Sequence, residues 1–372
     1  MRTTMGVGLL GAFLAVVAAV FADGPPQGNQ ASAASQPGEG KWTIISDKLL
    51  SSTPVPPDFN GLPGKTLKTT GVAVDRTTGD LIVVLFRSHI CRSSDRGKTF
   101  ERIDGGKLGG ICQTGWAINI DPNSGQRMAC FLIYGTSGLT LDGGKTWTTF
   151  GDSEFGAVDW SVPEPKVMLR TDHGHKVYLT RDAGKTWKLL DNVHVGNREG
   201  GESAGLGVVD SGTLLLHRKD GSGIERSTDD GETWAKVSDR NPKSGVAVVF
   251  NGVVYWVGAG GLIVSKDKGQ TWQVQGTPVD AIMGPFFGKD ENHIVVVGLK
   301  GLFETADGGK AWKNVMPLAA VEATLDPNVY YHKDARFGMK CVLTFNDSFA
   351  WDPIGNVLYH SRMTDSVRKF ER

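Results

Sequence analysis

An eight-residue motif recurs six times along this chain of 372 residues. Its pattern is [S/T]-x-D-x-G-x-[T/A]-[W/F], and a complete copy runs from Ser265 to Trp272. The central aspartates are 38 to 47 residues apart and are Asp95, Asp142, Asp182, Asp229, Asp267 and Asp307. A sequence period between about 20 and 50 residues is typical of solenoids, propellers and other repeat arrays. The motif therefore favours one large repeat domain.

Each motif closes a repeat of similar anatomy. In the fifth repeat, the apolar run Gly245–Phe250 is followed by the strong hairpin turn Asn251-Gly252 and by a second apolar run, Val253–Val257. Leu262–Ser265 then enters the motif, and Trp272–Val274 leaves it. Four short strands joined by tight turns in about 40 residues predict a propeller blade. Glycine, at 50 of 372 residues, is about twice as frequent as usual, which fits an all-β chain.

The C-terminal part of the chain predicts one more blade. Its first three strands are expected at Ala323–Leu325, Met339–Phe345 and Val357–Ser361. Trp42–Ile45 resembles the strand that follows every motif, so we expect it to pair with the last blade and to protect that open edge. The predicted fold is an all-β, seven-bladed propeller of four-stranded antiparallel blades. Six blades with a C-terminal appendage is the alternative.

The N-terminal residues have the features of a targeting segment. Arg2 precedes the uncharged run Val7–Phe21, which is too short for a membrane-spanning helix, and Ala22 is a suitable cleavage site. We expect residues 1–22 to be a cleaved signal peptide, although an uncleaved anchor is the alternative. Residues 23–40 are rich in Gly, Pro, Ala, Ser and Gln, which predicts a disordered linker. We expect residues 41–372 to form the propeller.

Export and charge limit the possible partners. The signal peptide predicts a secreted or periplasmic protein with no stable membrane insertion after cleavage. The formal net charge is zero, so nothing favours nucleic acid as a partner. A monomer is expected.

The residue types of the motif predict a structural role. The aspartate can accept a hydrogen bond from the backbone N–H two residues on, and the glycine supplies a positive φ. The hydroxyl can bond within the same turn, and the aromatic ring can pack beneath it. Six aspartates distributed around a ring cannot converge on one site. Catalytic acids or calcium ligands are therefore the less favoured interpretation of these residues.

These motifs resemble the Asp-box (BNR) repeats of the sialidase-like propeller superfamily. That superfamily includes sialidases, xyloglucanase-type glycoside hydrolases, the sortilin luminal domain and the photosystem II stability/assembly factors. The extended pattern at Gly258–Trp272 and Gly298–Trp312 is most similar to two of these branches, the xyloglucanases and the photosystem II assembly factors, which the repeats alone do not separate. The resemblance extends from Trp42 to the C-terminus and implies the fold, but it does not decide the activity.

A sialidase activity is disfavoured by missing elements. Sialidases carry an Arg-Ile-Pro element, whereas here Arg102-Ile103 is followed by Asp104. Tyr330-Tyr331 lacks a clear glutamate partner for the nucleophile pair of that family.

The resemblance also implies that function lies on the face opposite the motifs, in loops between strands two and three and between blades. The candidate binding residues in those loops are Arg87, His89, Asp172, His173, His175, Arg218, Lys219 and Trp351. The cations could hold an anionic sugar or protein segment, or could be ordinary solvated charges. Trp351, in an expected long loop, could stack on a sugar, anchor a partner or pack within the blade.

Candidate catalytic groups are few. Asp280 and Glu322 each begin an expected inner strand, so both could face the mouth of the central channel. Glycoside hydrolysis would require their carboxylates to be ~5–9.5 Å apart. Asp172, His173 and His175 offer too few ligands for a metal site, and no cofactor is expected. We therefore expect a non-catalytic binding or assembly module for a glycan or protein, with a xyloglucanase-like hydrolase as the alternative.

Export to an oxidising compartment would allow the four cysteines to form disulfides. Cys91 and Cys112 are expected to lie toward the same face in adjacent blades, so a disulfide between them is predicted. Cys130 and Cys341 lie within expected strands of blades two and seven, and we expect both to be free and buried. In blade two, the strand that contains Cys130 is expected to span Met128–Tyr134.

Overall fold

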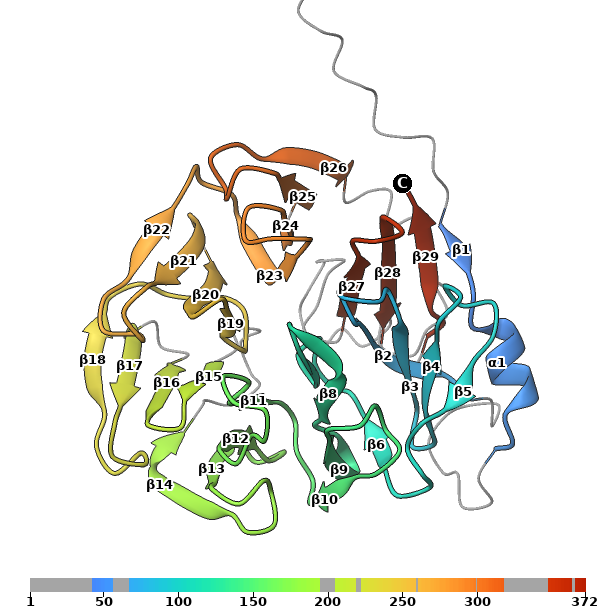
Figure 1. Ribbon diagram of the computed structural model, residues 1–372, viewed down its shortest axis with the longest axis horizontal. Helices are drawn as coiled ribbons and strands as arrows, with labels where there is room; N and C mark the ends of the chain where they lie inside the picture. Colours follow the sequence, from blue (N-terminus) through green and yellow to red (C-terminus); the bar gives the residue numbers. More distant parts are fainter. Residues whose placement is uncertain are drawn as a thin grey trace, which may run out of the picture. The chain divides into compact units, whose positions relative to one another are not determined.

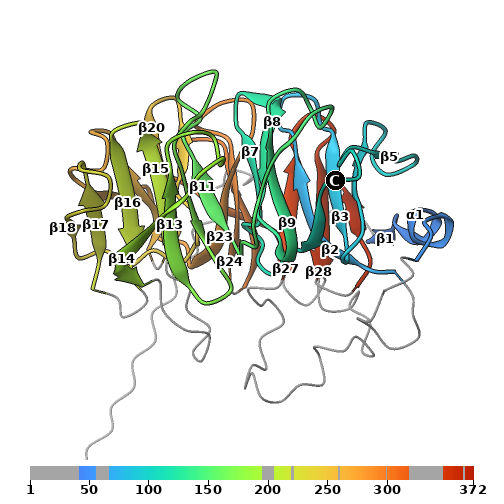
Figure 2. The same cartoon turned by 90° about the horizontal axis from the view of Figure 1, so that it is seen from below.

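Seven antiparallel sheets form the blades of a propeller in the computed structural model of this chain (Figures 1 and 2). The structure describes residues 42–55, 67–194, 205–218, 222–258, 260–298, 300–317, 347–362 and 365–372. The expected fold class is confirmed. Within each blade the four strands alternate in direction. The connections between strands two and three therefore lie on one face, here called the top face, and the motif turns lie on the other, the box face.

The first six blades follow the chain in order. Their strands are β2 (Thr69–Val74), β3 (Leu81–Leu85), β4 (Ile90–Ser93) and β5 (Glu101–Arg102); β7 (Ile118–Asp121), β8 (Ser124–Cys130), β9 (Ile133–Thr140) and β10 (Thr148–Phe150); β11 (Gly156–Val158), β12 (Met168–Thr171), β13 (Lys176–Thr180) and β14 (Lys188–His194); β15 (Gly205–Asp210), β16 (Thr213–His217), β17 (Ile224–Ser227) and β18 (Ala235–Ser238); β19 (Val248–Phe250), β20 (Val253–Gly258), β21 (Gly261–Ser265) and β22 (Gln273–Gln275); and β23 (Ala281–Phe287), β24 (Ile294–Gly298), β25 (Gly301–Thr305) and β26 (Lys313–Pro317).

The seventh blade joins the two ends of the propeller. It consists of β27 (Asp347–Asp352), β28 (Val357–Arg362), β29 (Arg368–Glu371) and the N-terminal β1 (Thr43–Ile44). Thr43 pairs with Lys369 and Ile44 with Arg368, so the predicted ring closure is confirmed.

The expected strand order within blade seven was wrong. Its innermost strand is β27, and Val357–Ser361 belongs to the second strand rather than the third. Ala323–Leu325 and Met339–Phe345 lie outside the described residues. This blade has no complete motif to mark the turn between its third and fourth strands, so its strands could not be counted from the sequence.

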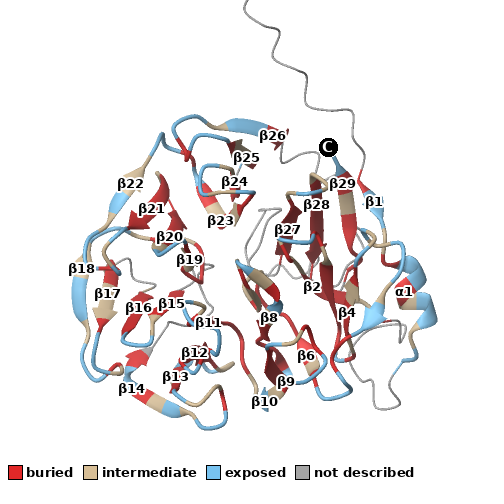
Figure 3. Cartoon of the chain, viewed as in Figure 1, coloured by how far each residue is buried: buried red, intermediate tan, exposed pale blue. Residues whose placement is uncertain are grey.

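The apolar core lies between neighbouring blades rather than within one blade. Figure 3 shows that inner strands such as β27 and β28 are buried. In β3, Ile82 and Val84 pack toward blade two, whereas Leu81 and Val83 pack toward Tyr359 of blade seven. The alternation of side chains along a strand produces these two faces. Each blade is therefore stabilised by both of its neighbours.

The predicted disulfide is absent from the structure, which is a correction. Cys91 and Cys112 are both free and buried. Cys91 packs toward blade seven and Cys112 toward blade two, so they lie on opposite sides of blade one. Burial raises the pKa of each thiol to about 12. Cys130 is free and buried as expected, and Cys341 lies outside the described residues.

The six motif turns, called box turns below, share the hydrogen bonds that join the Ser/Thr hydroxyl, the aspartate, the glycine N–H and the N–H four residues after the aspartate. In the fourth, Ser227 Oγ donates to Asp229 Oδ1 at 2.8 Å, and the Gly231 N–H donates to Ser227 Oγ at 2.9 Å. The Thr233 N–H and hydroxyl both donate to the Asp229 carboxylate, at 3.0 and 2.6 Å. Trp234 Nε1 donates to the Gly231 carbonyl at 3.1 Å. The aspartate therefore accepts hydrogen bonds from the residue four positions later, and not from the N–H two positions later that the sequence predicted. Each of these bonds stabilises the turn itself.

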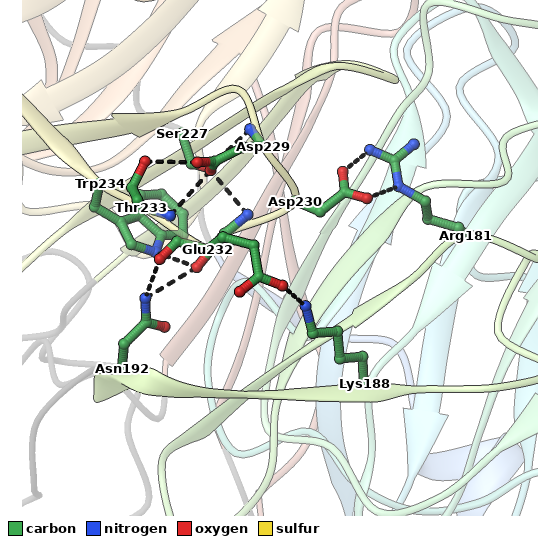
Figure 4. A network of polar contacts seen from close by, with 10 residues as sticks. Arg181, Lys188, Asn192, Ser227, Asp229, Asp230, Glu232, Thr233 and Trp234 are labelled. Carbon is green, nitrogen blue, oxygen red and sulfur yellow. Dashed lines mark hydrogen bonds and ion pairs between the residues drawn. The ribbon is translucent and has the colours of Figure 1, made fainter.

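Each box turn also contacts the preceding blade. Figure 4 shows Asn192 of blade three donating to the Gly231 and Glu232 carbonyls, and Lys188 bonding to Glu232. Arg181 forms a two-point ion pair with Asp230 of the same turn. In the first box turn, Arg96 Nε donates to Asp352 Oδ2 of blade seven at 3.0 Å. The box turns therefore hold neighbouring blades together, which extends the structural role expected for them.

A single short helix, α1 (Asp47–Ser52), is present in the described part of the chain. No helix among those residues is long and apolar enough to cross a membrane.

Candidate functional site

Three side chains from successive blades meet on the top face. Arg87 follows β3 in blade one, Tyr134 lies at the start of β9 in blade two, and His173 lies between β12 and β13 in blade three. The Arg87 guanidinium is 5.3 Å from the centroid of the Tyr134 ring. The Tyr134 hydroxyl is 2.9 Å from His173 Nε2, and the two rings are 4.8 Å apart. These residues are called the Arg87–Tyr134–His173 cluster below.

The cluster is accessible to solvent. Arg87 is exposed, and the Tyr134 side chain is 53% exposed. His173 is half-buried. The cluster therefore presents a cation and a broad aromatic face at the surface, two groups that recur at the centres of binding interfaces.

A strand that the sequence did not predict places Arg87 beside Tyr134. β6 (Gly109–Ile111) crosses the top face and pairs with β9, with Gly109 opposite Thr136. The Arg87 N–H donates to the Gly110 carbonyl at 2.8 Å, so β6 contacts both loops. A Cβ atom at Gly135 would lie 1.7 Å from the Gly109 carbonyl oxygen, so only glycine permits this approach.

The turn that carries His173 is anchored below the surface. Asp172 Oδ1 accepts the Lys176 N–H at 3.0 Å, and Asp172 Oδ2 accepts the Tyr178 hydroxyl at 2.9 Å. Burial, together with the bond to Asp172, raises the pKa of Tyr178. His175 Nδ1 lies 3.3 Å from Oε2 of the buried Glu154. Two of the predicted site residues, Asp172 and His175, therefore position the turn rather than face solvent freely.

Backbone strain concentrates in the same three loops. Arg87, Tyr134 and His175 have φ values of 49°, 56° and 63°. The left-handed region costs a non-glycine residue roughly 1–2 kcal/mol, and such strain gathers at functional sites. Outside the box turns, the other described non-glycine residues with positive φ are Asn251 and Asn356, which tolerate this conformation best. The three bulky exceptions are all in top-face loops of blades one to three.

Other predicted binding residues do not join the cluster. His89 lies 3.1 Å from Ser88 Oγ and 4.0 Å from the buried Asp104. Arg218 forms a two-point ion pair with Glu225, with both Nε to carboxylate oxygen distances at 3.0 Å. Lys219 lies outside the described residues.

Trp351 differs most from its predicted setting. It is part of the innermost strand β27 rather than a long loop, and it is 3% exposed. Its ring meets His293 edge-on, with centroids 4.7 Å apart. Of the three expectations for this residue, which were stacking on a sugar, anchoring a partner and packing within the blade, the structure supports packing within the propeller.

Only one residue of the candidate catalytic pair lies within the described part of the chain. Asp280 is exposed and directly precedes β23, as expected. Glu322 lies outside the described residues, so the distance between the two carboxylates is not defined. Within the described ranges, no group of three or more His, Cys, Asp or Glu side chains could hold a metal ion.

Tyr134 was missed because the run Met128–Tyr134 was interpreted as one strand. In the structure β8 ends at Cys130, and Tyr134 is the second residue of the next strand, β9, close to the loop that joins the two strands. The glycine that directly follows this run, Gly135, was the signal in the sequence, because an isolated glycine in a strand pattern suggests a bulge or a close backbone approach.

Comparisons with known proteins concern the fold. No family model matches the chain, and no curated protein does. Among solved structures, YCF48 bound to a D1 peptide is 14% identical, with a TM-score of 0.45, over 82% of this chain and 93% of that one. YCF48 from Cyanidioschyzon merolae is 14% identical, with a TM-score of 0.45, over 89% and 98%. The GH74 xyloglucanase from Xanthomonas campestris is 15% identical, with a TM-score of 0.39, over 87% and 61%.

Proposed function

We propose that this protein is an exported, non-catalytic binding module that contacts a protein partner through the Arg87–Tyr134–His173 cluster. The observation that carries the proposal is the coincidence of exposure and strain. The cluster exposes a large aromatic ring and a cation, and its loops hold three non-glycine residues in the left-handed region. Strain of this kind persists where the surrounding structure holds it in place for function.

The residue types favour a protein over a glycan. Tyrosine and arginine are enriched among the side chains that carry most of the binding energy in protein interfaces. The Tyr134 ring is already covered on one side by Arg87 and met by His173, so less of its face is left for a sugar ring. A glycan remains the second candidate ligand, because an exposed aromatic ring can also stack on sugar.

The acids beside the cluster support binding rather than hydrolysis. Asp172 accepts hydrogen bonds from Tyr178 and Lys176, and Glu154 lies 3.3 Å from His175 Nδ1. These contacts give both carboxylates a part in positioning the turn that carries His173. Release of products from xyloglucan, abolished by Asp280→Asn or Glu322→Gln, would instead establish the hydrolase alternative.

The two ends of β9 allow a matched test by photo-crosslinking. A photoreactive phenylalanine analogue would replace Tyr134 at the top face or Leu141 in the box turn, which are 53% and 40% exposed. We expect a discrete crosslinked protein in the source cells from position 134 and none from position 141. Equal products from both positions, or none from either, would contradict the proposal. Selective retention on a glycan array that Tyr134→Ala abolishes would favour the glycan.

Export forms part of the same proposal. Cleavage after Ala22 would give a mature chain that begins at Asp23. N-terminal sequencing of the protein from its source cells tests this, and an intact Met1 or a different first residue would contradict it.

A further inference from the structure

A buried carboxylate contacts the turn that carries His173. Glu154 is 4% exposed and lies just before β11, where its backbone N–H donates to the Thr171 carbonyl at 3.0 Å. Its Oε2 atom has no hydrogen-bond donor in the part of the chain that the structure describes. A buried carboxylate without a donor is costly unless an opposite charge lies beside it. The order of this corner of blade three therefore depends on the group that Glu154 Oε2 faces.

That group is a histidine. His175 Nδ1 lies 3.3 Å from Glu154 Oε2, and the His175 side chain is 18% exposed, so its ring can exchange protons with solvent. Histidine is the side chain whose charge ordinarily changes between about pH 5 and pH 8. The contact is therefore an ion pair when the ring is protonated. When the ring is neutral, the buried carboxylate is left without an opposite charge.

The other charged and titratable groups around the turn have different partners. In blade three they are Asp152, Arg170, Asp172, His173, Lys176 and Tyr178, and Arg87 and Tyr134 approach the turn at His173 from blades one and two. Arg170 donates to the Asp152 carbonyl at 2.5 Å, and Asp172 accepts hydrogen bonds within the turn. Among the described residues, Glu154 is the acid that forms an ion pair with His175.

The turn links His175 to the exposed cluster. The His175 N–H donates to the Asp172 carbonyl at 3.0 Å, and the Lys176 N–H donates to Asp172 Oδ1 at 3.0 Å, so His173 lies within one hydrogen-bonded unit. His175 has a φ value of 63°, a conformation that persists only where the surroundings hold it. Loss of the ion pair would therefore loosen the turn and, with it, the contact between His173 and Tyr134.

We propose that the Glu154–His175 contact makes the binding surface sensitive to pH. When His175 is protonated, the ion pair holds the turn in place and His173 stays against Tyr134. The ion pair favours the charged ring, so its contribution is complete at the acidic end of this range and is lost as the pH rises. The turn then opens and admits water to the carboxylate. This inference rests on the proposed function, because it describes the regulation of the same surface.

Amide hydrogen exchange in the mature protein tests the turn directly, without a partner. The reporter is the Lys176 N–H, which donates to Asp172 Oδ1 at 3.0 Å. The reference is the Thr186 N–H of the same blade, which donates to Asp182 Oδ1 at 2.8 Å. Hydrogen bonds from Thr186 lower the pKa of Asp182 to about 2, so that aspartate stays charged from about pH 5 to pH 8.

The two amides should respond differently to pH. After correction for the intrinsic exchange rates, we expect the protection of Lys176 to fall about tenfold between the two ends of the range, the usual effect of losing one contact to a charged group. The protection of Thr186 should change by less than about twofold, because the charge of its acceptor does not change.

Two conservative variants each remove the ion pair. Glu154→Gln keeps the shape of the side chain without its charge, and His175→Asn introduces a residue that tolerates a positive φ and does not titrate. We expect the pH dependence at Lys176 to disappear in both. Glu164→Gln is the matched control, because Glu164 is an exposed acid between β11 and β12 of the same blade. This variant should keep the pH dependence of the wild type.

Two results would overturn the inference. The first is protection at Lys176 that does not change across the range in the wild type, a result that counts even if a variant fails to fold. The second is a pH dependence that survives Glu154→Gln but vanishes in His173→Gln, which would assign the titration to His173. Failure of the crosslinking at Tyr134 would remove the proposed function and leave the exchange result intact, whereas unchanged exchange would remove only the pH response.

Discussion

The left-handed residues are the clearest single-residue feature of this protein, and they occur in two settings. In the box turns, the residue after the aspartate and the glycine that follows it both have positive φ. Ala183 and Gly184, for example, have φ values of 61° and 87°. Two consecutive residues of this kind make the tight turn that suits the twist of a hairpin. The top-face loops also contain residues with left-handed backbone conformation, but no repeated sequence pattern marks them.

Ala183 and Gly184 allow opposite changes at adjacent positions. Ala183→Gly should raise the free energy of unfolding by about 1 kcal/mol, because it removes left-handed strain from an alanine. Gly184→Ala should lower it by a similar or larger amount, because the new Cβ would also lie 3.0 Å from Phe150. Denaturant titration measures both values. Changes of the same sign in the two variants would contradict this account of the turn.

The box aspartates predict how stability depends on pH. Hydrogen bonds from Thr186 and Thr233 lower the pKa of Asp182 and Asp229 to about 2. A lowered pKa means that folding favours the charged form. Its contribution is complete above the ordinary value of 3.8 and is lost as the pH falls toward 2. Denaturant midpoints should therefore fall across this window, less steeply in Asp229→Asn. If the denaturant midpoints of the variant and the wild type fell equally steeply with pH, this account of the box aspartates would be contradicted.

Among the elements, β1 closes the ring although it has only two residues. Its two residues complete the last blade by pairing with β29, so that this blade is not left with an open edge. The preceding Trp42 is 7% exposed and packs with Phe370, with ring centroids 5.6 Å apart. The N-terminal closure is thus held both by backbone pairing and by a buried indole.

Two substitutions compare the buried and the exposed side chains of this segment. Trp42→Ala should lower the free energy of unfolding by about 3–5 kcal/mol, the usual cost of removing a large buried ring. Ile44→Ala in the same element should cost less than about 1 kcal/mol, because Ile44 is 50% exposed. Thermal and denaturant unfolding measure both. Similar losses in the two variants would show that the indole is not the main contact.

At the scale of the whole molecule, the repeated motif made the ring of blades predictable because it marks the same turn in six of them. Blade seven lacks a complete motif, and its inner strand was misplaced. The disulfide was wrong because the side of blade one on which Cys91 and Cys112 lie depends on strand alternation and on β6, which spacing alone does not give.

The candidate site was only partly predictable for a related reason. Arg87 and His173 were identified from their loops, but Tyr134, which joins them, lay within an expected strand. Its neighbour Gly135 and the crossing strand β6 acquire their meaning only from contacts between blades. Residues from three repeats, each more than 35 positions apart in sequence, form one surface.

The central claim is that the strained top-face surface exists to bind a partner. The most direct measurement compares Tyr134→Gly with Ala183→Gly in their affinity for the protein crosslinked at position 134. Both variants release a left-handed residue, at opposite faces, and both should be neutral or more stable, by up to about 1 kcal/mol. We predict that Tyr134→Gly weakens binding by at least about tenfold, as expected for a central interface residue, while Ala183→Gly leaves it unchanged. Equal affinities in the two variants would contradict the account.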